Sequence, residues 1–145
     1  MTQVQRSTTT INDKFGIIDI KKIVDERGAL CVVEANDKNF PFEIKRVFWI
    51  YGVPADKTRG KHAHRTCSEI LIPLHGSFTA HVKDGERTEH FVMSTPSQGL
   101  YIPPMVWCSF SDFTPDCVCL CLTSQPYDTE GYIDDINQFE EEIGQ

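Results

Sequence analysis

Short runs of apolar residues, several of them with alternating polar positions, follow one another along the chain and are separated by turn residues. The runs FGIIDIKKIV and ALCVVEA flank the turn DERG, and FEIKRVFWIYGV precedes the loop-like segment VPADKTRG. Runs rich in β-branched and aromatic residues predict strands, and turn signals that recur about every ten residues are typical of a sandwich or barrel. From Phe15 onward the pattern therefore predicts an all-β body.

Two positions predict local features of this body. Pro73 lies inside the run ILIPLH, and because proline has no backbone N–H, it predicts an edge position or a β-bulge. The pair Asp84-Gly85 lies between two strand-like runs, and this pair is a strong signal for a tight hairpin.

The two ends of the chain depart from the strand pattern. Tyr132, Ile136, Phe139 and Ile143 recur at steps of three and four residues, which predicts one apolar stripe on a short acidic helix over about 127–144. We expect this helix to dock on one end of a jelly roll. Residues 1–14 are polar and predict a flexible arm, so the single domain spans residues 15–145.

Composition and charge narrow the class of protein. The chain has 145 residues, enough for one domain with its own core, and a formal net charge of -7. The net charge and the lack of a Lys/Arg cluster argue against nucleic acid as a partner. No apolar run has the length of a membrane-spanning helix, and the N-terminus lacks the apolar core of a secretory signal. We therefore expect a cytoplasmic protein with no membrane contact.

Cysteine spacing favours buried thiols over a structural metal site. No two of the six cysteines form a CxxC pair, so a zinc ribbon is not favoured. Three of them alternate in DCVCLCL, where same-face neighbours on one strand are poorly placed to form a disulfide. We interpret Cys117, Cys119 and Cys121 as small apolar residues in a reducing compartment.

The segment RGKHAHRTCSEILIPLHG carries the chemistry-bearing residues of the chain. Alternation along a strand puts His62 and His64 on one face. HxH followed by Glu69 and then by Gly76 resembles the first motif of the cupin family. In the register of the second cupin motif, the usual His is replaced by Cys108. The resemblance implies a cupin jelly-roll barrel with both histidines facing inward.

Two kinds of chemistry fit this segment. In metal cupins the ligands are the equivalents of His62, His64 and Glu69 together with the second-motif His, and a Cys108 thiolate could serve in place of the last. Imidazole, carboxylate and thiolate all bind zinc or iron. A neutral pair of histidines can instead move protons, because histidine titrates near physiological pH.

The wider sequence resembles the sugar-nucleotide 3,4-ketoisomerases, which act on dTDP-4-keto-6-deoxyglucose. The resemblance runs over about residues 16 to 140 and is carried by RG-x-HAH, LYIPPM-x-W and the YD-x-x-x-YI tail. It implies a homodimer with exchanged N-terminal strands, no metal and no cofactor. The keto group would move from C4 to C3 through an enediol in deoxysugar biosynthesis, with His62 and His64 as the catalytic pair.

Elementary chemistry agrees with that resemblance. A proton beside a ketone is weakly acidic, so the reaction needs a positioned base and a donor to the enediol oxygen. No redox cofactor is needed, and the chain has no GxGxxG motif. We assign His62 as the main base at C3, with His64 donating to the oxyanion or relaying the proton.

Several departures from the family pattern keep other functions open. Phe48 and Trp49 stand where the family commonly has tyrosines, so Tyr51 or Tyr101 would have to supply a phenol. Glu69 stands where glutamine is common, and His or Arg is usual at the position of Cys108. The alternatives are a metal-dependent cupin enzyme that uses His62, His64, Glu69 and Cys108, or a non-catalytic sugar-binding cupin.

Arginines and aromatic residues are the candidates for substrate binding. Arginine is a natural clamp for a diphosphate, and Arg59 lies three residues before His62. Arg27 and Arg46 match family positions, and Arg27 would reach the phosphate across the dimer; the alternative for both is a surface ion pair. Tyr101 and Trp107 would stack on the thymine or line the sugar pocket, and the alternative for each is core packing.

Overall fold

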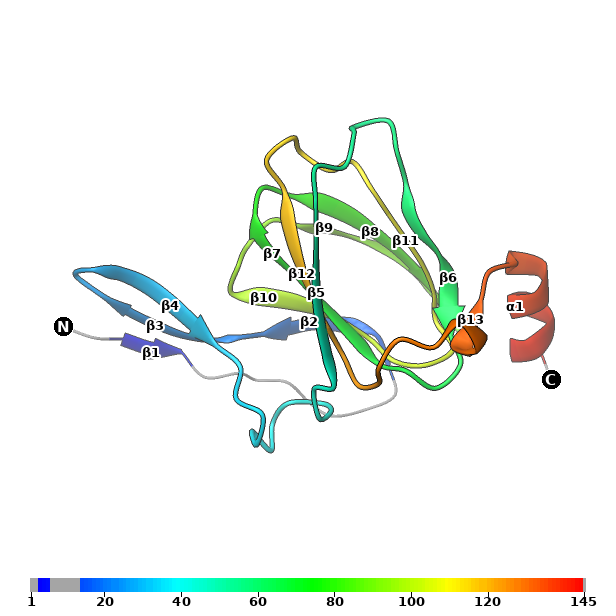
Figure 1. Cartoon of the computed structure of the whole chain (residues 1–145), viewed down its shortest axis with the longest axis horizontal. Helices are drawn as coiled ribbons and strands as arrows, with labels where there is room; N and C mark the ends of the chain where they lie inside the picture. The colour runs from blue at the N-terminus through cyan, green and yellow to red at the C-terminus, as the bar shows by residue number, and fades with distance from the viewer. Residues whose placement is uncertain (1–2, 6–13, 145) are drawn as a thin grey trace.

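Two antiparallel five-stranded sheets face each other and enclose the interior of a jelly-roll barrel (Figure 1). The computed structural model describes residues 3–5 and 14–144. The first sheet has the strand order β2-β10-β7-β12-β5, and the second has the order β13-β6-β11-β8-β9. This architecture confirms the all-β fold that the sequence pattern predicts. The elements are β1 Gln3–Gln5, β2 Gly16–Asp19, β3 Lys21–Asp25, β4 Gly28–Val32, β5 Arg46–Tyr51, β6 Arg59–His64, β7 Glu69–His75, β8 Phe78–Lys83, β9 Thr88–Met93, β10 Gln98–Ile102, β11 Trp107–Ser111, β12 Val118–Thr123, η1 Thr129–Gly131, β13 Tyr132–Ile133 and α1 Ile136–Ile143.

The inward faces of both sheets pack against each other as one core. Leu71 and Leu100 of the first sheet and Phe78 and Phe110 of the second belong to the same buried cluster. The rings of Phe78 and Phe110 meet edge to face at 6.1 Å between centroids. Removing this apolar surface from water is the main favourable term for closing the barrel.

Strand register arranges the inward-facing residues of the first sheet in layers. Thr123 of β12 pairs with Arg46 on one side and with Glu69 on the other. Two residues along the same strand, Cys121 pairs with Phe48 and with Leu71. A polar layer therefore lies directly beside an apolar layer inside the barrel.

A second buried cluster covers part of the outer face of the first sheet. Ile70, Ile72 and Tyr101 point away from the barrel interior and pack beneath Phe40 and Phe42, which lie between β4 and β5. Alternate residues of the buried strands β7 and β10 thus serve two cores, which explains their nearly continuous apolar sequence.

A three-stranded arm formed by β1, β3 and β4 projects away from the barrel (Figure 1). Residues 3–5 pair with residues 22–24 of β3. Of the flexible arm expected over residues 1–14, residues 3–5 are therefore a strand, and Lys14 lies within ion-pair distance of Glu86. The rest of that segment lies outside the described residues.

The C-terminal helix is shorter than the sequence pattern predicts. We expected a helix over about 127–144, whereas α1 spans Ile136–Ile143 and begins after Asp135, whose side chain accepts a hydrogen bond from the Asn137 amide at 2.8 Å. Tyr132 and Ile133 instead pair with β6, and strand pairing is incompatible with helix. Phe139 alone is buried from the helix itself, packed with Ala63 and Ile133.

The two local features expected in the strands are present. β7 is a central strand, so Pro73 is not at an edge, and the pairing of β7 with β12 shifts register beside it, as a bulge requires. β8 and β9 form the expected hairpin, with the Asp84 amide donating to the Arg87 carbonyl at 3.0 Å across the turn.

The cysteines are arranged as the sequence predicts. All six cysteines are free, and Cys117, Cys119 and Cys121 are buried as expected. Burial raises the pKa of the Cys117 thiol to about 11, which keeps it protonated at neutral pH.

In the part of the chain that the structure describes, no helix has the length and apolarity needed to cross a membrane.

Candidate active site

A distorted start of β6 fixes the two histidines. Gly60 and Lys61 both have positive φ values, 84° and 62°, and the pairing of β6 with β11 shifts register at the same place. A side chain at Gly60 would meet the Phe110 ring at 3.0 Å. Bulges re-aim side chains next to functional sites, and a non-glycine residue at positive φ is a marked strain. The bulge sets the direction in which His62 and His64 leave the strand.

His62 and His64 lie against each other at the wall of the barrel. Their ring centroids are 4.9 Å apart, and the rings are nearly perpendicular at 78°. His62 is half-buried, while His64 is buried. Burial lowers the pKa of His62, and the neighbouring His64 lowers it further. A neutral imidazole at neutral pH is free to accept a proton.

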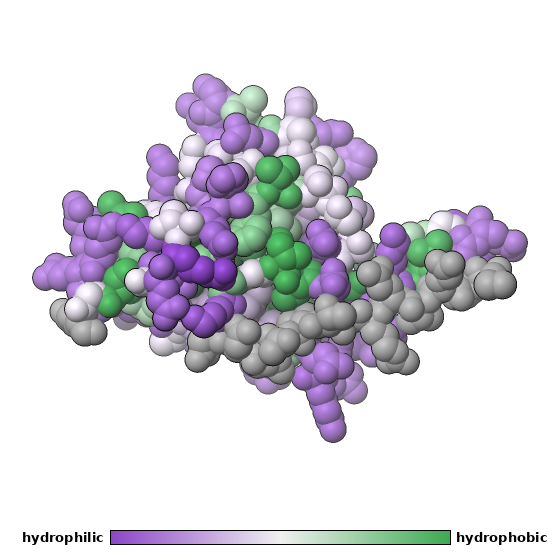
Figure 2. All heavy atoms as spheres, turned by 180° about the vertical axis from the view of Figure 1, so that it is seen from behind, coloured by the Kyte–Doolittle hydropathy of each residue, from purple (hydrophilic) through white to green (hydrophobic). Residues whose placement is uncertain are grey.

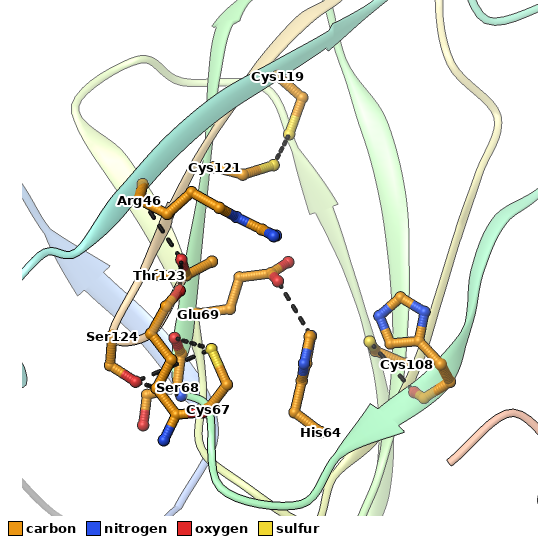
Figure 3. A network of polar contacts seen from close by, with 12 residues as sticks. Arg46, His64, Cys67, Ser68, Glu69, Cys108, Cys119, Cys121, Thr123 and Ser124 are labelled. Carbon is orange, nitrogen blue, oxygen red and sulfur yellow. Dashed lines mark hydrogen bonds and ion pairs between the residues drawn. The ribbon is translucent and has the colours of Figure 1, made fainter. Parts of the chain in front are cut away.

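Glu69 of β7 reaches across the interior to His64 (Figure 3). Its Oε2 lies 3.2 Å from His64 Nε2, and both side chains are 6% exposed. A carboxylate at this distance restrains the orientation of the His64 ring. The same charge also opposes the fall in the pKa of His62.

Tyr132 and Arg46 complete the polar layer beside the histidines. Backbone pairing puts Tyr132 opposite His64, and its ring centroid lies 5.0 Å from that of His62 and 4.6 Å from that of His64. The Arg46 guanidinium lies over Phe48, with Cζ 4.6 Å from the ring centroid. Burial raises the pKa of the Tyr132 phenol, and a hydrogen bond with Arg46 offsets part of that rise.

These side chains open onto a pocket of about 390 Å³. It is large enough for part of a nucleotide sugar, and its wall combines apolar rings with two arginines, one imidazole and one carboxylate, a composition typical of small-molecule sites. The lining residues are Arg46, Val47, Phe48, Ile50, Arg59, Gly60, His62, Glu69, Phe110, Tyr127 and Tyr132.

Comparison with known proteins decides the family. The family model described as "FdtA: WxcM-like, C-terminal" matches residues 13–144. The chain belongs to the FdtA family. A TDP-4-oxo-6-deoxy-α-D-glucose-3,4-oxoisomerase from Aneurinibacillus thermoaerophilus is 39% identical over 127 residues, which are 88% of this chain and 91% of the relative.

Two solved structures extend the likeness to the FdtA-family fold. A mutant of the 3,4-ketoisomerase QdtA from Thermoanaerobacterium thermosaccharolyticum, in complex with TDP-4-keto-6-deoxyglucose, is 37% identical with a TM-score of 0.84, covering 89% of this chain and 93% of that one. The TDP-fucose-3,4-ketoisomerase WlaRA from Campylobacter jejuni is 36% identical with a TM-score of 0.83, covering 89% and 95%. These findings confirm the resemblance that the motifs indicated.

Four of the predicted site residues of this FdtA-family chain meet at the pocket or its wall. His62, Arg46 and Arg59 line the pocket directly. His64 lies behind them, between His62 and Glu69. Arg59 is exposed at the strand that carries the histidines, so its guanidinium is free to meet an anion entering from solvent.

The other four predicted residues lie away from the pocket lining. Tyr51 is 70% exposed on the outward face of β5, and Tyr101 is buried in the outer cluster, where its ring centroid is 6.4 Å from that of Phe42. Trp107 packs on Phe139 of the C-terminal helix at 5.9 Å between centroids. Arg27 sits in the β3–β4 turn with its NH2 group 2.6 Å from Asp25.

Tyr132 is a site residue that sequence reasoning missed. The apolar spacing of the C-terminal segment assigned it to a helix stripe, whereas it lies on β13. The signal was present in the YD-x-x-x-YI tail, whose second tyrosine is Tyr132.

The geometry of Cys108 does not support the metal alternative. Its thiol donates toward the His62 backbone carbonyl at 3.5 Å, and burial raises its pKa well above the usual value. Across residues 3–5 and 14–144, no three His, Cys, Asp or Glu side chains are grouped to hold a metal ion. His64 and Glu69 contact each other instead.

Proposed function

We propose that this chain is a 3,4-ketoisomerase that moves the keto group of TDP-4-keto-6-deoxyglucose from C4 to C3 in deoxysugar biosynthesis. One observation carries the proposal. A neutral His62, backed by the buried pair of His64 and Glu69, faces a pocket with two arginines in a chain whose relatives are named 3,4-ketoisomerases. No cofactor is needed, because the reaction exchanges only protons.

His62 is the base in this mechanism. Its lowered pKa leaves the imidazole neutral at neutral pH, and it is the histidine that lines the pocket. It removes the C3 proton, the electron pair forms the enediolate, and a proton returned to C4 completes the transfer. His64 lies between His62 and Glu69, and we assign it as the partner that relays the proton of His62.

Arg59 and Arg46 are the basic groups that bind the substrate. Both line the pocket, Arg59 at its exposed side and Arg46 next to Tyr132. A guanidinium binds a diphosphate through paired, charge-assisted hydrogen bonds. We assign Arg59 to the diphosphate and Arg46 to the sugar end of the ligand. The thymine contacts proposed for Tyr101 and Trp107, and the pocket contact proposed for Tyr51, need rearrangement or a second chain.

Turnover followed by proton NMR in D₂O tests the function. Wild-type protein is expected to convert TDP-4-keto-6-deoxyglucose into the 3-keto sugar, with deuterium appearing at C4. Binding of the substrate without turnover would favour the non-catalytic sugar-binding cupin. Stoichiometric iron or zinc in protein purified without added metal, with activity lost on chelation, would favour the metal-dependent enzyme.

We also propose that the chain forms a homodimer through the arm and the outer face of the first sheet. An apolar groove of about 310 Å³ runs over this face, and Leu74 and Val47 on its wall are 46% and 50% exposed. The arm carries hydrophobic surface as well (Figure 2), including Leu30 at 57% exposure. A second copy with an exchanged N-terminal strand would cover both surfaces and would bring Arg27 to its partner's site.

The oligomeric state in solution tests this interface. Light scattering after size exclusion is expected to give twice the chain mass for the wild type, and Leu74→Arg is expected to give monomers because it puts a charge into the groove. Val92→Arg is the matched control, since Val92 is 68% exposed on β9 of the other sheet. A monomeric wild type would contradict the interface.

The cytoplasmic location stays a prediction.

A further inference from the structure

The reaction proposed above requires movement of protons on oxygen as well as on carbon. When the ketone moves from C4 to C3, the oxygen on C4 gains a proton and the oxygen on C3 loses one. The two imidazoles account for the proton on carbon. A group that both gives and takes a proton at the two adjacent oxygens is still needed.

Tyrosine is suited to this role, and only some tyrosines of the chain are near the site. The chain has four tyrosines. Tyr51 and Tyr101, which the sequence offered as substitutes for the missing family phenol, lie outside the pocket lining. Tyr127 lines the pocket but is 64% exposed. Tyr132 lines the pocket, is half-buried and touches both histidines.

The fold holds Tyr132 firmly in this position. β13 pairs with β6 at Tyr132 opposite His64 and at Ile133 opposite Ala63. Just before the strand, the Gly131 carbonyl accepts a hydrogen bond from the Arg65 amide at 2.8 Å. Ile133 is buried with Phe139 on the far side of this strand. A group held by backbone pairing and packing on both sides needs little reorganisation to act.

We propose that the Tyr132 hydroxyl is a third catalytic group, which shuttles a proton between the two sugar oxygens; this inference rests on the proposed ketoisomerase function. As His62 takes the proton from C3, the phenol gives its proton to the oxygen on C4, and the enediol forms. The phenolate then takes the proton from the oxygen on C3 while C4 receives a proton from His62, whose imidazolium proton exchanges with solvent between the two steps. Tyr132 ends protonated and no atom or electron is left over.

Arg46 makes the phenolate stage accessible. Its guanidinium lines the same pocket, and its positive charge lowers the pKa of the Tyr132 phenol. A fixed positive charge beside a developing phenolate stabilises it in a site that excludes water. Burial raises the pKa of the phenol, so the hydroxyl carries its proton at neutral pH when the cycle begins.

Removing the hydroxyl while keeping the ring tests the proposal. In Tyr132→Phe the ring contacts with both histidines remain, and we expect kcat to fall by about 10²-fold or more with KM changed little, since general acid–base groups contribute about 10²–10⁴. Tyr51→Phe removes the same hydroxyl from a tyrosine that is 70% exposed and lies outside the pocket lining, so it is the control and is expected to keep kcat within about twofold. Circular dichroism and thermal melts check that both variants fold.

A second variant separates catalysis from packing. Incorporating 3,5-difluorotyrosine at position 132 keeps the ring and the hydroxyl but makes the phenol more acidic. We expect the alkaline limb of the kcat profile to move to lower pH, which a packing role would not cause. If the wild type is active and Tyr132→Phe keeps the same kcat, the proposed role of Tyr132 is wrong, and the ketoisomerase function stands. The same conclusion follows if the alkaline limb does not move in the fluorinated protein. A wild type that fails to turn over TDP-4-keto-6-deoxyglucose would overturn the ketoisomerase function as well.

Discussion

Two pairs of side chains with the same spacing face the interior of the barrel, but only one pair has polar partners at the pocket. His62 and His64 leave β6 on one face, and Cys119 and Cys121 leave β12 on one face. The histidines meet Glu69 and Tyr132 at the pocket. The two cysteines are 0% exposed, lie 3.9 Å apart between sulfur atoms and have apolar neighbours (Figure 3).

Strand register explains the difference between the two pairs. Thr123, two residues beyond Cys121, is in the layer of Arg46 and Glu69, whereas Cys121 itself is in the layer of Phe48 and Leu71. A step of two residues along one strand therefore separates a polar, pocket-facing layer from a sealed apolar layer. The same i, i+2 pattern therefore serves the pocket in one layer and the core in the other, where the contact with Cys119 and burial raise the pKa of the Cys121 thiol.

The largest expected effect is the loss of the pocket-facing member of the histidine pair. His62→Asn keeps a polar side chain of similar size but removes the base, and kcat is expected to fall by about 10³-fold, within the range for a general base. His75→Asn, at a surface histidine whose side chain is 70% exposed, is the control and should leave kcat unchanged. Undiminished deuterium wash-in at C4 by the His62 variant would reject the assignment of the base.

A smaller effect is expected from the carboxylate behind the pair. Glu69→Gln keeps a contact to His64 but removes the charge that raises the pKa of His62. The acid limb of kcat/KM, which lies below the ordinary histidine pKa of about 6.5 in the wild type, is expected to move to still lower pH. We expect kcat to fall by about tenfold, because a neutral amide stabilises positive charge on the histidine pair less than a carboxylate does. An acid limb that stays in place or moves to higher pH would contradict this electrostatic coupling.

Acid sensitivity of the fold should follow the same histidine. Because the folded pKa of His62 is lowered, the unfolded chain binds more protons as the pH falls below about 6.5, and the free energy of unfolding decreases there. Denaturant titrations between pH 5 and pH 7 are expected to show this loss, by about 1 kcal/mol or less, and His62→Asn should reduce it. An identical pH dependence in both proteins would show that His62 does not contribute.

The smallest effect on activity is expected at the cysteine pair. Cys121→Ala is expected to lower the free energy of unfolding by about 1–2 kcal/mol, the usual cost of a small core cavity, and to leave kcat within about twofold. Thiol reagents should modify the exposed Cys31 in the native protein but reach Cys119 and Cys121 only after denaturation. Loss of kcat in a stably folded Cys121 variant would show that the apolar layer takes part in the chemistry.

Sequence by itself determined the barrel, the family and the paired histidines. Alternation, turn spacing and the HxH segment are local properties of the chain, and each survives in the structure as strands β5 to β12 and the paired imidazoles. The buried thiols of DCVCLCL also followed from local alternation.

Only the tertiary structure decided which other side chains join the pair. Tyr132 reaches the histidines because β13 pairs with β6, and Glu69 reaches His64 across the barrel interior from β7. Tertiary packing also puts Tyr101 in the outer cluster and Trp107 against Phe139 of the C-terminal helix. Contacts between segments distant in sequence depend on strand order and register, and the two-residue period of a strand leaves open which layer and which face of the barrel a side chain will share.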